Sequence, residues 1–322
     1  MIGVKTPFRI SFAGGSSDIS YYYEKFGGRV ISTSISKYMY HFINEYKNKN
    51  ETLIKYSRTE LIKGEKVIKH PIVNEISKLY DIKGLDIHSI ADIPKGSGLA
   101  SSSAYTVGLI KGLSYLNKED LKKEEIAKAA CIVEINKLKE PIGKQDQYAV
   151  SCGGLNLIEF NKDGSVLIKK IDINKQESEF LSSSLILVKV GKSRKASTIL
   201  SMQKENIKDE KVLNSIHEIQ ELVDPMFSAI TKLDMKRIGE ILSYNWKLKT
   251  SLTKSTTNTL VDQTFERISK VNGFYGGKLL GAGGSGYFLI AGNESAIHTI
   301  SNKFETIKFS LDHKGTNIII DS

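Results

Sequence analysis

Cysteine, proline and long hydrophobic runs are all scarce in this chain, and each shortage excludes a class of protein. Its 322 residues include only two cysteines, Cys131 and Cys152, which cannot build a disulfide framework or a cysteine-rich metal site. The five prolines mark no proline-rich hinge. No run of 18 apolar residues occurs, and the N-terminus lacks the zones of a signal peptide. We therefore expect a cytoplasmic globular protein, long enough for one large or two medium domains.

Acidic residues are also in the minority, 36 against 46 basic ones, which gives a net charge of +10. The lysines are spread along the chain, and the six histidines are scattered without the spacing of metal ligands. The excess of positive charge is explained by a lysine-rich surface or, in part, by a site for an anionic small substrate. Both interpretations are favoured over nucleic-acid binding. We expect no nucleic-acid partner and no membrane association. The composition gives no indication of the oligomeric state.

Apolar periodicity predicts a mixture of strands and helices, which is an α+β chain. Before about residue 180 we expect strands at 5–14, 84–94, 153–160 and 164–173, one or two strands at 29–46, and helices at 71–79, 98–116 and 118–138. After it we expect a buried strand at 184–191, helices within 196–249 and 258–271, a strand–turn–strand unit at 277–292, and a closing helix and strand. This change of pattern predicts two domains, residues 1–180 and 181–322.

Two glycine-rich segments carry the chemical signal. "GAGGSG" at 281–286 matches the G-x-G-x-x-G of dinucleotide-binding folds, but the apolar residues 287–290 that follow favour a strand, whereas that fingerprint opens a helix. We interpret it as a hairpin turn that packs against another segment or a ligand. "PKGSGLASSSA" at 94–104 places glycines and three serines at the start of a helix, where free N–H groups and the helix dipole attract phosphate. A well-capped helix after a loop is the alternative interpretation.

Three segments in order, "TPFRISFAGGSSD", "PKGSGLASSSA" and "KLLGAGGSG", resemble the motifs of the GHMP kinases over nearly the whole chain. The chain departs from them at Ala100 and Ser285, where the family usually or often has glycine. The resemblance implies a two-domain α+β fold with an N-terminal domain like ribosomal protein S5 domain 2 and an α+β C-terminal domain. It also implies ATP-dependent phosphoryl transfer with Mg²⁺.

Three further segments resemble the D-glycero-D-manno-heptose 7-phosphate kinases of that family: "FGGRVISTSISKYMY", "QDQYAVSCGGLN" and Trp246-Lys247-Leu248-Lys249. This resemblance implies transfer of the γ-phosphoryl group to the anomeric hydroxyl of a heptose 7-phosphate, for the synthesis of surface-polysaccharide precursors. A fucokinase-like enzyme for an unphosphorylated sugar and a non-catalytic sugar sensor of the same fold remain alternatives.

By the same resemblance, Asp146 is the catalytic base and Arg9 the cation beside it, whereas an ordinary aspartate at a helix N-terminus is the alternative for Asp146. Ser102 and Glu134 hold Mg²⁺; Glu134 follows a small-residue helix face, although a surface glutamate would fit the sequence too. The predicted ATP-binding residues are Pro94, Gly96, Ser97, Gly98, Leu99, Ala100, Ser101, Ser102 and Ser103. The predicted acceptor-binding residues are Gly14, Gly15, Asp18, Asp146, Arg194, Lys249, Gly283 and Gly284.

Overall fold

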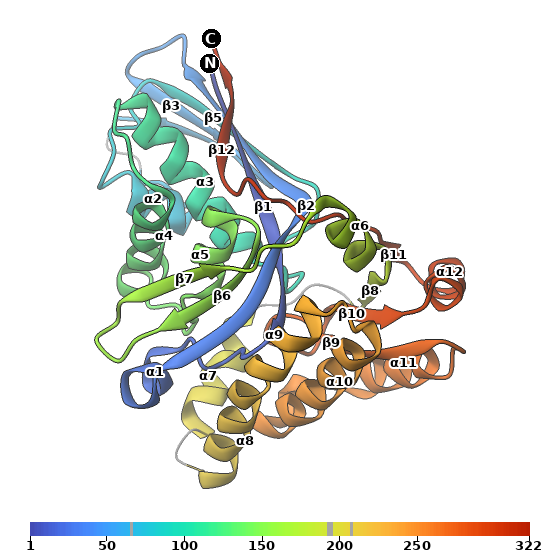
Figure 1. Cartoon of the computed structure of the whole chain (residues 1–322). Coiled ribbons are helices and arrows are strands. Elements are labelled where there is room, and N and C mark those ends of the chain that lie inside the picture. Colours follow the sequence, from blue (N-terminus) through green and yellow to red (C-terminus); the bar gives the residue numbers. More distant parts are fainter. Residues whose placement is uncertain (65–66, 192–195, 207–208) are drawn as a thin grey trace.

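The computed structural model describes residues 1–64, 67–191, 196–206 and 209–322, which form two sheets with helices packed on them (Figure 1). Within these ranges the first sheet has eight strands, in the order β12-β1-β2-β5-β3-β4, with β6 beside β2 and β7 beside β6. All pairs are antiparallel except β3 and β5. The strands are β1 (Ile2–Ala13), β2 (Gly28–Glu45), β3 (Glu51–Lys55), β4 (Thr59–Lys63), β5 (Leu85–Ala91), β6 (Leu155–Phe160), β7 (Val166–Lys170) and β12 (Asn317–Asp321).

Strand β2 is the central strand of the first sheet, because it is long enough to pair with three other strands. Its 18 residues are rich in β-branched and aromatic side chains, which favour extended backbone. Residues 28–33 pair with β6, residues 39–45 pair with β5, and β1 runs along the opposite edge of β2. The segment in which the sequence predicted one or two strands is therefore a single strand.

Helix α3 covers the first sheet and lies against β1 and β2, with α4 and α5 packed beside it (Figure 1). The small and apolar residues of α3 are almost all buried, which explains why its sequence shows little amphipathic contrast. The helices of this half are α1 (Ser20–Phe26), α2 (Pro71–Ile76), α3 (Ser101–Leu116), α4 (Lys123–Cys131), the π-helical turn η1 (Ile132–Lys137), α5 (Gln145–Cys152) and α6 (Lys175–Ser183).

The second sheet is antiparallel, in the order β11-β8-β10-β9 among the described residues. Its strands are β8 (Leu185–Val190), β9 (Phe274–Leu279), β10 (Gly286–Gly292) and β11 (Thr306–Ile307). Leu187 and Leu289 belong to a core that continues into the first sheet, whereas Val188 and Phe288 belong to a separate core on the other face. Both faces of β8 and β10 are covered, and this explains their continuous apolar runs.

Helix α10 lies against β9, and Trp246 meets the ring of Phe288 edge to face at 5.9 Å between centroids. Helices α8 and α9 pack beside α10 (Figure 1). The remaining helices are α7 (Ala196–Asn206), α8 (Glu210–Glu221), α9 (Val223–Thr231), α10 (Met235–Leu252), the short 3₁₀ turn η2 (Lys254–Thr256), α11 (Thr259–Ser269) and α12 (Glu294–Lys303).

The α+β class predicted from the sequence is confirmed, and the predicted strand–turn–strand unit is the β9–β10 hairpin. The domain boundary near residue 180 stays a prediction. The first sheet takes its edge strand β12 from the far end of the chain, so the two chain termini lie together (Figure 1). No helix in the described part of the chain is both long and apolar enough to cross a membrane.

Candidate active site

The loop before α3 presents backbone donors at a helix N-terminus, as its sequence predicted. The N-cap of α3 is Ala100, whose side chain cannot cap the N–H groups of the first helical turn. Ala100 has a φ of +66°, the left-handed conformation that glycine adopts more easily. Ser101 and Ser102 follow in the first turn and remain partly exposed, whereas Leu99 is fully buried in the core. The arrangement suits an anion at the start of α3.

The C-terminal glycine segment packs directly onto this loop. A Cβ atom on Gly98 would lie 2.7 Å from the Leu280 carbonyl oxygen, and one on Gly286 would lie 2.6 Å from the Ser97 carbonyl oxygen. Real Cβ atoms do not approach backbone so closely, so both positions require glycine. The segment forms the β9–β10 turn, which contradicts a dinucleotide fingerprint and confirms that it packs against another part of the chain.

Asp146 and Arg9 form an ion pair beneath the loop. Asp146 lies in the first turn of α5, where its Oδ1 accepts bonds from Arg9 Nη2 at 2.7 Å and Nε at 2.8 Å. The remaining terminal nitrogen of Arg9, Nη1, donates to the Gly98 carbonyl oxygen at 2.7 Å. Arg9 is 4% exposed, so its hydrogen bonds hold the carboxylate of Asp146 in a fixed orientation.

The second carboxylate oxygen of Asp146, Oδ2, has no hydrogen-bond partner among the described residues, and the side chain is 29% exposed. Asp146 does lie at a helix N-terminus, as the alternative interpretation also predicts, but within the described residues its side chain is bonded by the side chains of Arg9 and Gln145 and not by the backbone of α5. One oxygen is held by Arg9 and the other is open to a ligand, which is the arrangement that a base beside a reacting hydroxyl requires.

Glu134 is fully buried in the π-helical turn η1, which contradicts the interpretation of a surface glutamate. Its carboxylate accepts hydrogen bonds from the Ser102 hydroxyl, from the Ser103 hydroxyl at 2.9 Å and from Gln147 Nε2 at 2.7 Å. Burial raises the pKa of Glu134, and these three hydrogen bonds oppose that rise. No cation pairs with this carboxylate in the described part of the chain.

The residues around Glu134 fit a magnesium ion. A buried carboxylate without a countercharge is costly, and a cation bound there would remove that cost. Glu134 and Ser102 supply one carboxylate and one hydroxyl oxygen, which is a typical protein share of a Mg²⁺ site completed by phosphate and water. The described residues contain no cluster of three or more acidic, histidine or cysteine side chains that would suit zinc.

Asp18 lies at the same N-terminal end of α5 as Asp146. It is 8% exposed, and its Oδ2 accepts a bond from the Gln145 backbone N–H at 3.1 Å. Burial and, to a smaller extent, the neighbouring Asp146 raise the pKa of Asp18 to about 6. Of the glycines before it, Gly14 has a φ of +84° and packs on the Arg29 carbonyl, whereas nothing lies within 4 Å of the Cβ position of Gly15. Gly15 therefore leaves space near Asp18.

Lys249 is the predicted acceptor-binding cation that the structure brings to this site. Its Nζ donates to the carbonyl oxygens of Leu279, at 3.4 Å, and Gly281. Burial and the nearby charge of Arg9 lower the pKa of Lys249 to about 7. Lys247, two residues earlier on α10, is exposed. Arg194 lies outside the described residues.

The predicted roles of Gly283 and Gly284 in acceptor binding have a competing structural explanation. The Gly284 N–H donates to the Thr256 carbonyl oxygen at 2.6 Å, so this donor is occupied. A Cβ atom on Gly283 would lie 2.5 Å from the same oxygen. Both glycines therefore hold the β9–β10 turn against η2.

Sequence reasoning missed Gln147 and Lys278. Gln147 lies one residue after Asp146 on α5 but turns away from it to bind Glu134. Lys278 on β9 is 4% exposed and donates to Asn245 Oδ1 on α10 at 2.8 Å. Burial, Lys249 and Arg9 lower the pKa of Lys278 well below its usual range. A lysine beside a glycine motif gives no sequence signal for such burial, because lysines are normally exposed.

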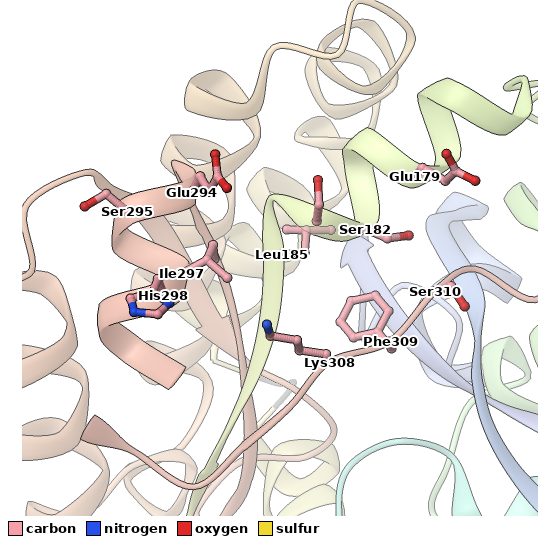
Figure 2. Close-up of a pocket in the computed structure, with 11 residues that line it drawn as sticks. Glu179, Ser182, Leu185, Glu294, Ser295, Ile297, His298, Lys308, Phe309 and Ser310 are labelled. Atoms are coloured by element: carbon pink, nitrogen blue, oxygen red, sulfur yellow. The ribbon is translucent and has the colours of Figure 1, made fainter. Parts of the chain in front are cut away.

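A cleft of about 740 Å³ opens elsewhere, between α6, α12 and residues 308–310 (Figure 2). Figure 2 shows Phe309, Leu185 and Ile297 among the residues that line it, together with Lys308 and His298. None of the predicted catalytic or nucleotide-binding residues lines this cleft. Its size alone therefore does not mark the active site.

Comparison with known proteins agrees with the geometry. Residues 65–154 match the N-terminal domain of the GHMP kinases. The chain is 30% identical to D-glycero-alpha-D-manno-heptose 7-phosphate kinase of Campylobacter jejuni, over 89% of this chain and 88% of that protein. It is 27% identical to the bifunctional fucokinase/GDP-fucose pyrophosphorylase of Arabidopsis thaliana, over 67% of this chain and 20% of that protein.

A solved structure has the same fold. The D-glycero-D-manno-heptose 1-phosphate kinase of Bacteroides thetaiotaomicron superposes with a TM-score of 0.80 at 21% identity, over the full length of both chains. The chain therefore belongs to the GHMP kinase family and is a phosphotransferase of the kinase class.

Proposed function

We propose that this chain transfers the γ-phosphoryl group of ATP, with Mg²⁺, to the anomeric hydroxyl of D-glycero-D-manno-heptose 7-phosphate, for the synthesis of surface-polysaccharide precursors. The observation that carries the proposal is the hydrogen-bonded unit of Asp146, Arg9 and the Gly98 carbonyl. Arg9 joins the predicted base to the predicted phosphate loop, so an acceptor and a nucleotide would meet at one place. The choice of a heptose phosphate rests on the similarity to the Campylobacter jejuni kinase.

In this proposal the nucleotide phosphates lie over residues 96–103, at the N-terminus of α3. Glu134 and Ser102 would hold Mg²⁺, which would neutralise phosphate charge when bound. The left-handed turn at Ala100 and the glycine contacts around Gly98 fix the loop. Positioning of this kind accounts for most of the catalysis of phosphoryl transfer.

The acceptor hydroxyl would lie at Oδ2 of Asp146. The oxygen of the acceptor hydroxyl forms a new bond to the γ-phosphorus. The bond from that phosphorus to the β–γ bridging oxygen breaks, and ADP leaves. The hydroxyl proton passes to Asp146 Oδ2, while Oδ1 stays hydrogen-bonded to Arg9. Asp18 would accept a hydrogen bond from another sugar hydroxyl.

The phosphate of the acceptor needs a cation, and Lys249 is the described candidate. Among the described residues its Nζ donates only to backbone carbonyls, so no described carboxylate has to be displaced. The predicted contribution of Arg194 remains a proposal from the sequence. A charge-assisted hydrogen bond contributes about 1.5–3 kcal/mol, so losing the Lys249 contact should weaken acceptor use by about 10-fold to 100-fold.

The test is a coupled ADP-release assay with heptose 7-phosphate, free heptose, fucose and galactose, followed by phosphorus NMR of the product. We expect turnover of heptose 7-phosphate and a phosphate on its anomeric carbon. Similar kcat/KM for free and phosphorylated sugars would instead favour a fucokinase-like enzyme. Sugar binding without any ADP release would favour a non-catalytic sensor.

The exposed lysine on the same helix provides a matched control. Lys249→Ala should raise KM for heptose 7-phosphate far more than KM for ATP, whereas Lys247→Ala should change neither. If the enzyme requires the sugar phosphate but Lys249→Ala binds it normally, another cation holds that phosphate and the kinase function stands.

A further inference from the structure

Tyr21 lies next to the predicted acceptor site. It belongs to the first turn of α1, whose N-cap is Ile19, so Asp18 comes just before the helix, and the charge of Asp18 acts on the Tyr21 hydroxyl. Helical side chains lean toward the helix N-terminus, which for Tyr21 is the side on which the chain enters from Asp18. On its other side the ring packs against the cluster that includes Leu248 and Leu252, which flank Lys249 on α10.

The hydroxyl group of Tyr21 is buried and has no hydrogen-bond partner among the described residues. Buried tyrosine hydroxyls are normally bonded, because an unpaired one costs about 1–3 kcal/mol. Burial, with a smaller effect of the Asp18 charge, raises the pKa of Tyr21, so the hydroxyl keeps its proton and can donate. Asp18 does not accept that proton in a hydrogen bond, although its charge is near enough to act on the hydroxyl.

The next residue shows what a satisfied hydroxyl looks like in the same helix. Tyr22 is fully buried, and its hydroxyl is 2.6 Å from Nδ1 of His217 on α8. Its ring lies 5.2 Å from that imidazole, centroid to centroid. Tyr22 therefore connects α1 to α8, whereas no residue in the described part of the chain bonds to the hydroxyl of Tyr21.

We infer that Tyr21 is a specificity-determining residue of the acceptor site, and that its hydroxyl donates to the same sugar hydroxyl that Asp18 accepts from. A sugar hydroxyl both donates and accepts, so one such group placed between Asp18 and Tyr21 satisfies both side chains. In this conformation the Tyr21 oxygen is covered, so the sugar reaches it as the side chains above it shift. This inference rests on the proposed function, because it requires a sugar acceptor.

The test compares Tyr21→Phe with Tyr22→Phe on the full-length enzyme. The substrates are whichever sugar acceptor the wild type turns over and a set of analogues that each lack one hydroxyl. Tyr21→Phe should lower kcat/KM for the complete acceptor about 3-fold to 10-fold, the effect of one neutral hydrogen bond. For one analogue the wild type and Tyr21→Phe should become nearly equal, which identifies the hydroxyl that Tyr21 contacts.

A stability measurement separates this role from a structural one. Tyr21→Phe removes an unpaired buried hydroxyl, so the variant should melt no lower than the wild type, whereas Tyr22→Phe should melt lower and keep the wild-type preference among the analogues.

Equal kcat/KM values for Tyr21→Phe and the wild type on every acceptor would overturn this inference and leave the proposed function intact. The same loss of kcat/KM on all analogues, with none of them brought level with the wild type, would also overturn it. A wild-type enzyme that phosphorylates no sugar would overturn both.

Discussion

The substitution Asp146→Asn tests the predicted base with a minimal change of shape. The amide can keep its oxygen toward Arg9, and that oxygen then still accepts the hydrogen bonds that Arg9 donates to Oδ1. The Nδ2 group would then occupy the place of Oδ2 and present hydrogens to the acceptor hydroxyl. An amide in that position cannot take up the proton, so catalysis should fail while the nucleotide loop is preserved.

The expected size follows from the role of the lost oxygen. General base catalysis contributes about 10²-fold to 10⁴-fold, so kcat should fall by that factor. This fall corresponds to a rise of about 2.7–5.4 kcal/mol in the activation free energy. Arg9 would lose its countercharge, which costs stability because the guanidinium is only 4% exposed. The cost is limited because Nη1 keeps the Gly98 carbonyl and the aspartate site is partly open to solvent.

The assay measures ADP release at saturating acceptor and ATP, and calorimetry measures nucleotide affinity with Mg²⁺. A matched control is Asp224→Asn, because Asp224 also pairs with an arginine, Arg29, through two hydrogen bonds of 2.5 and 3.0 Å, but is 71% exposed and lies on α9. The control should keep wild-type turnover, and both variants should bind ATP. Turnover of Asp146→Asn within tenfold of the wild type would refute the assignment.

Four other variants probe the metal, the acceptor phosphate and the loop. Glu134→Ala and Ser102→Ala should each raise the Mg²⁺ concentration needed for half-maximal activity, with partial rescue by excess Mg²⁺; unchanged metal dependence with weaker sugar binding would remove them from the metal site. Since the pKa of Lys249 is about 7, its ammonium form is lost as pH rises above 7, so acceptor kcat/KM should decline there. Lys249→Arg keeps its charge and should abolish the decline, and a decline that persists unchanged would assign it to another group. Ala100→Gly should raise thermal stability by about 0.5–1 kcal/mol, because glycine relieves the left-handed backbone at φ +66° at some entropic cost, and a lower melting temperature would contradict that reasoning.

Much of the fold was predictable from the sequence because its signals are local. The apolar run at 184–191 predicted the buried strand β8, and the turn-rich residues 281–286 between apolar segments predicted the β9–β10 hairpin. The helix after the 94–104 segment was predicted from small and apolar residues and is present as α3. Each of these patterns extends over only a few consecutive residues, so it predicts the helix or strand without knowledge of the tertiary structure.

The sequence also nominated the residues that the fold assembles at the site. Arg9, Ser102, Glu134 and Asp146 come from separate motifs, and the hydrogen bonds join them in two groups, Arg9 with Asp146 and Ser102 with Glu134. The sequence alone left the interpretation of Asp146 as a capping residue and of Glu134 as a surface residue open. The contacts in the folded chain show that Glu134 is buried and that Asp146 is paired with Arg9. The sequence could not show this, because the same residue types occur at surfaces and at helix ends.

Tertiary structure alone decided which polar groups are buried and what they meet. Lys278 finds Asn245 33 positions away, and Ser103 finds Glu134 31 positions away, so no local pattern predicts either pair. Tyr21 and Tyr22 are identical neighbours in sequence, yet the Tyr22 hydroxyl is bonded to His217, 195 positions away, and the Tyr21 hydroxyl has no partner within the ranges that the structure describes. Local sequence determined that both lie on α1. The packing of α8 and α10 around that helix decided their different surroundings, since burial depends on which distant segments meet.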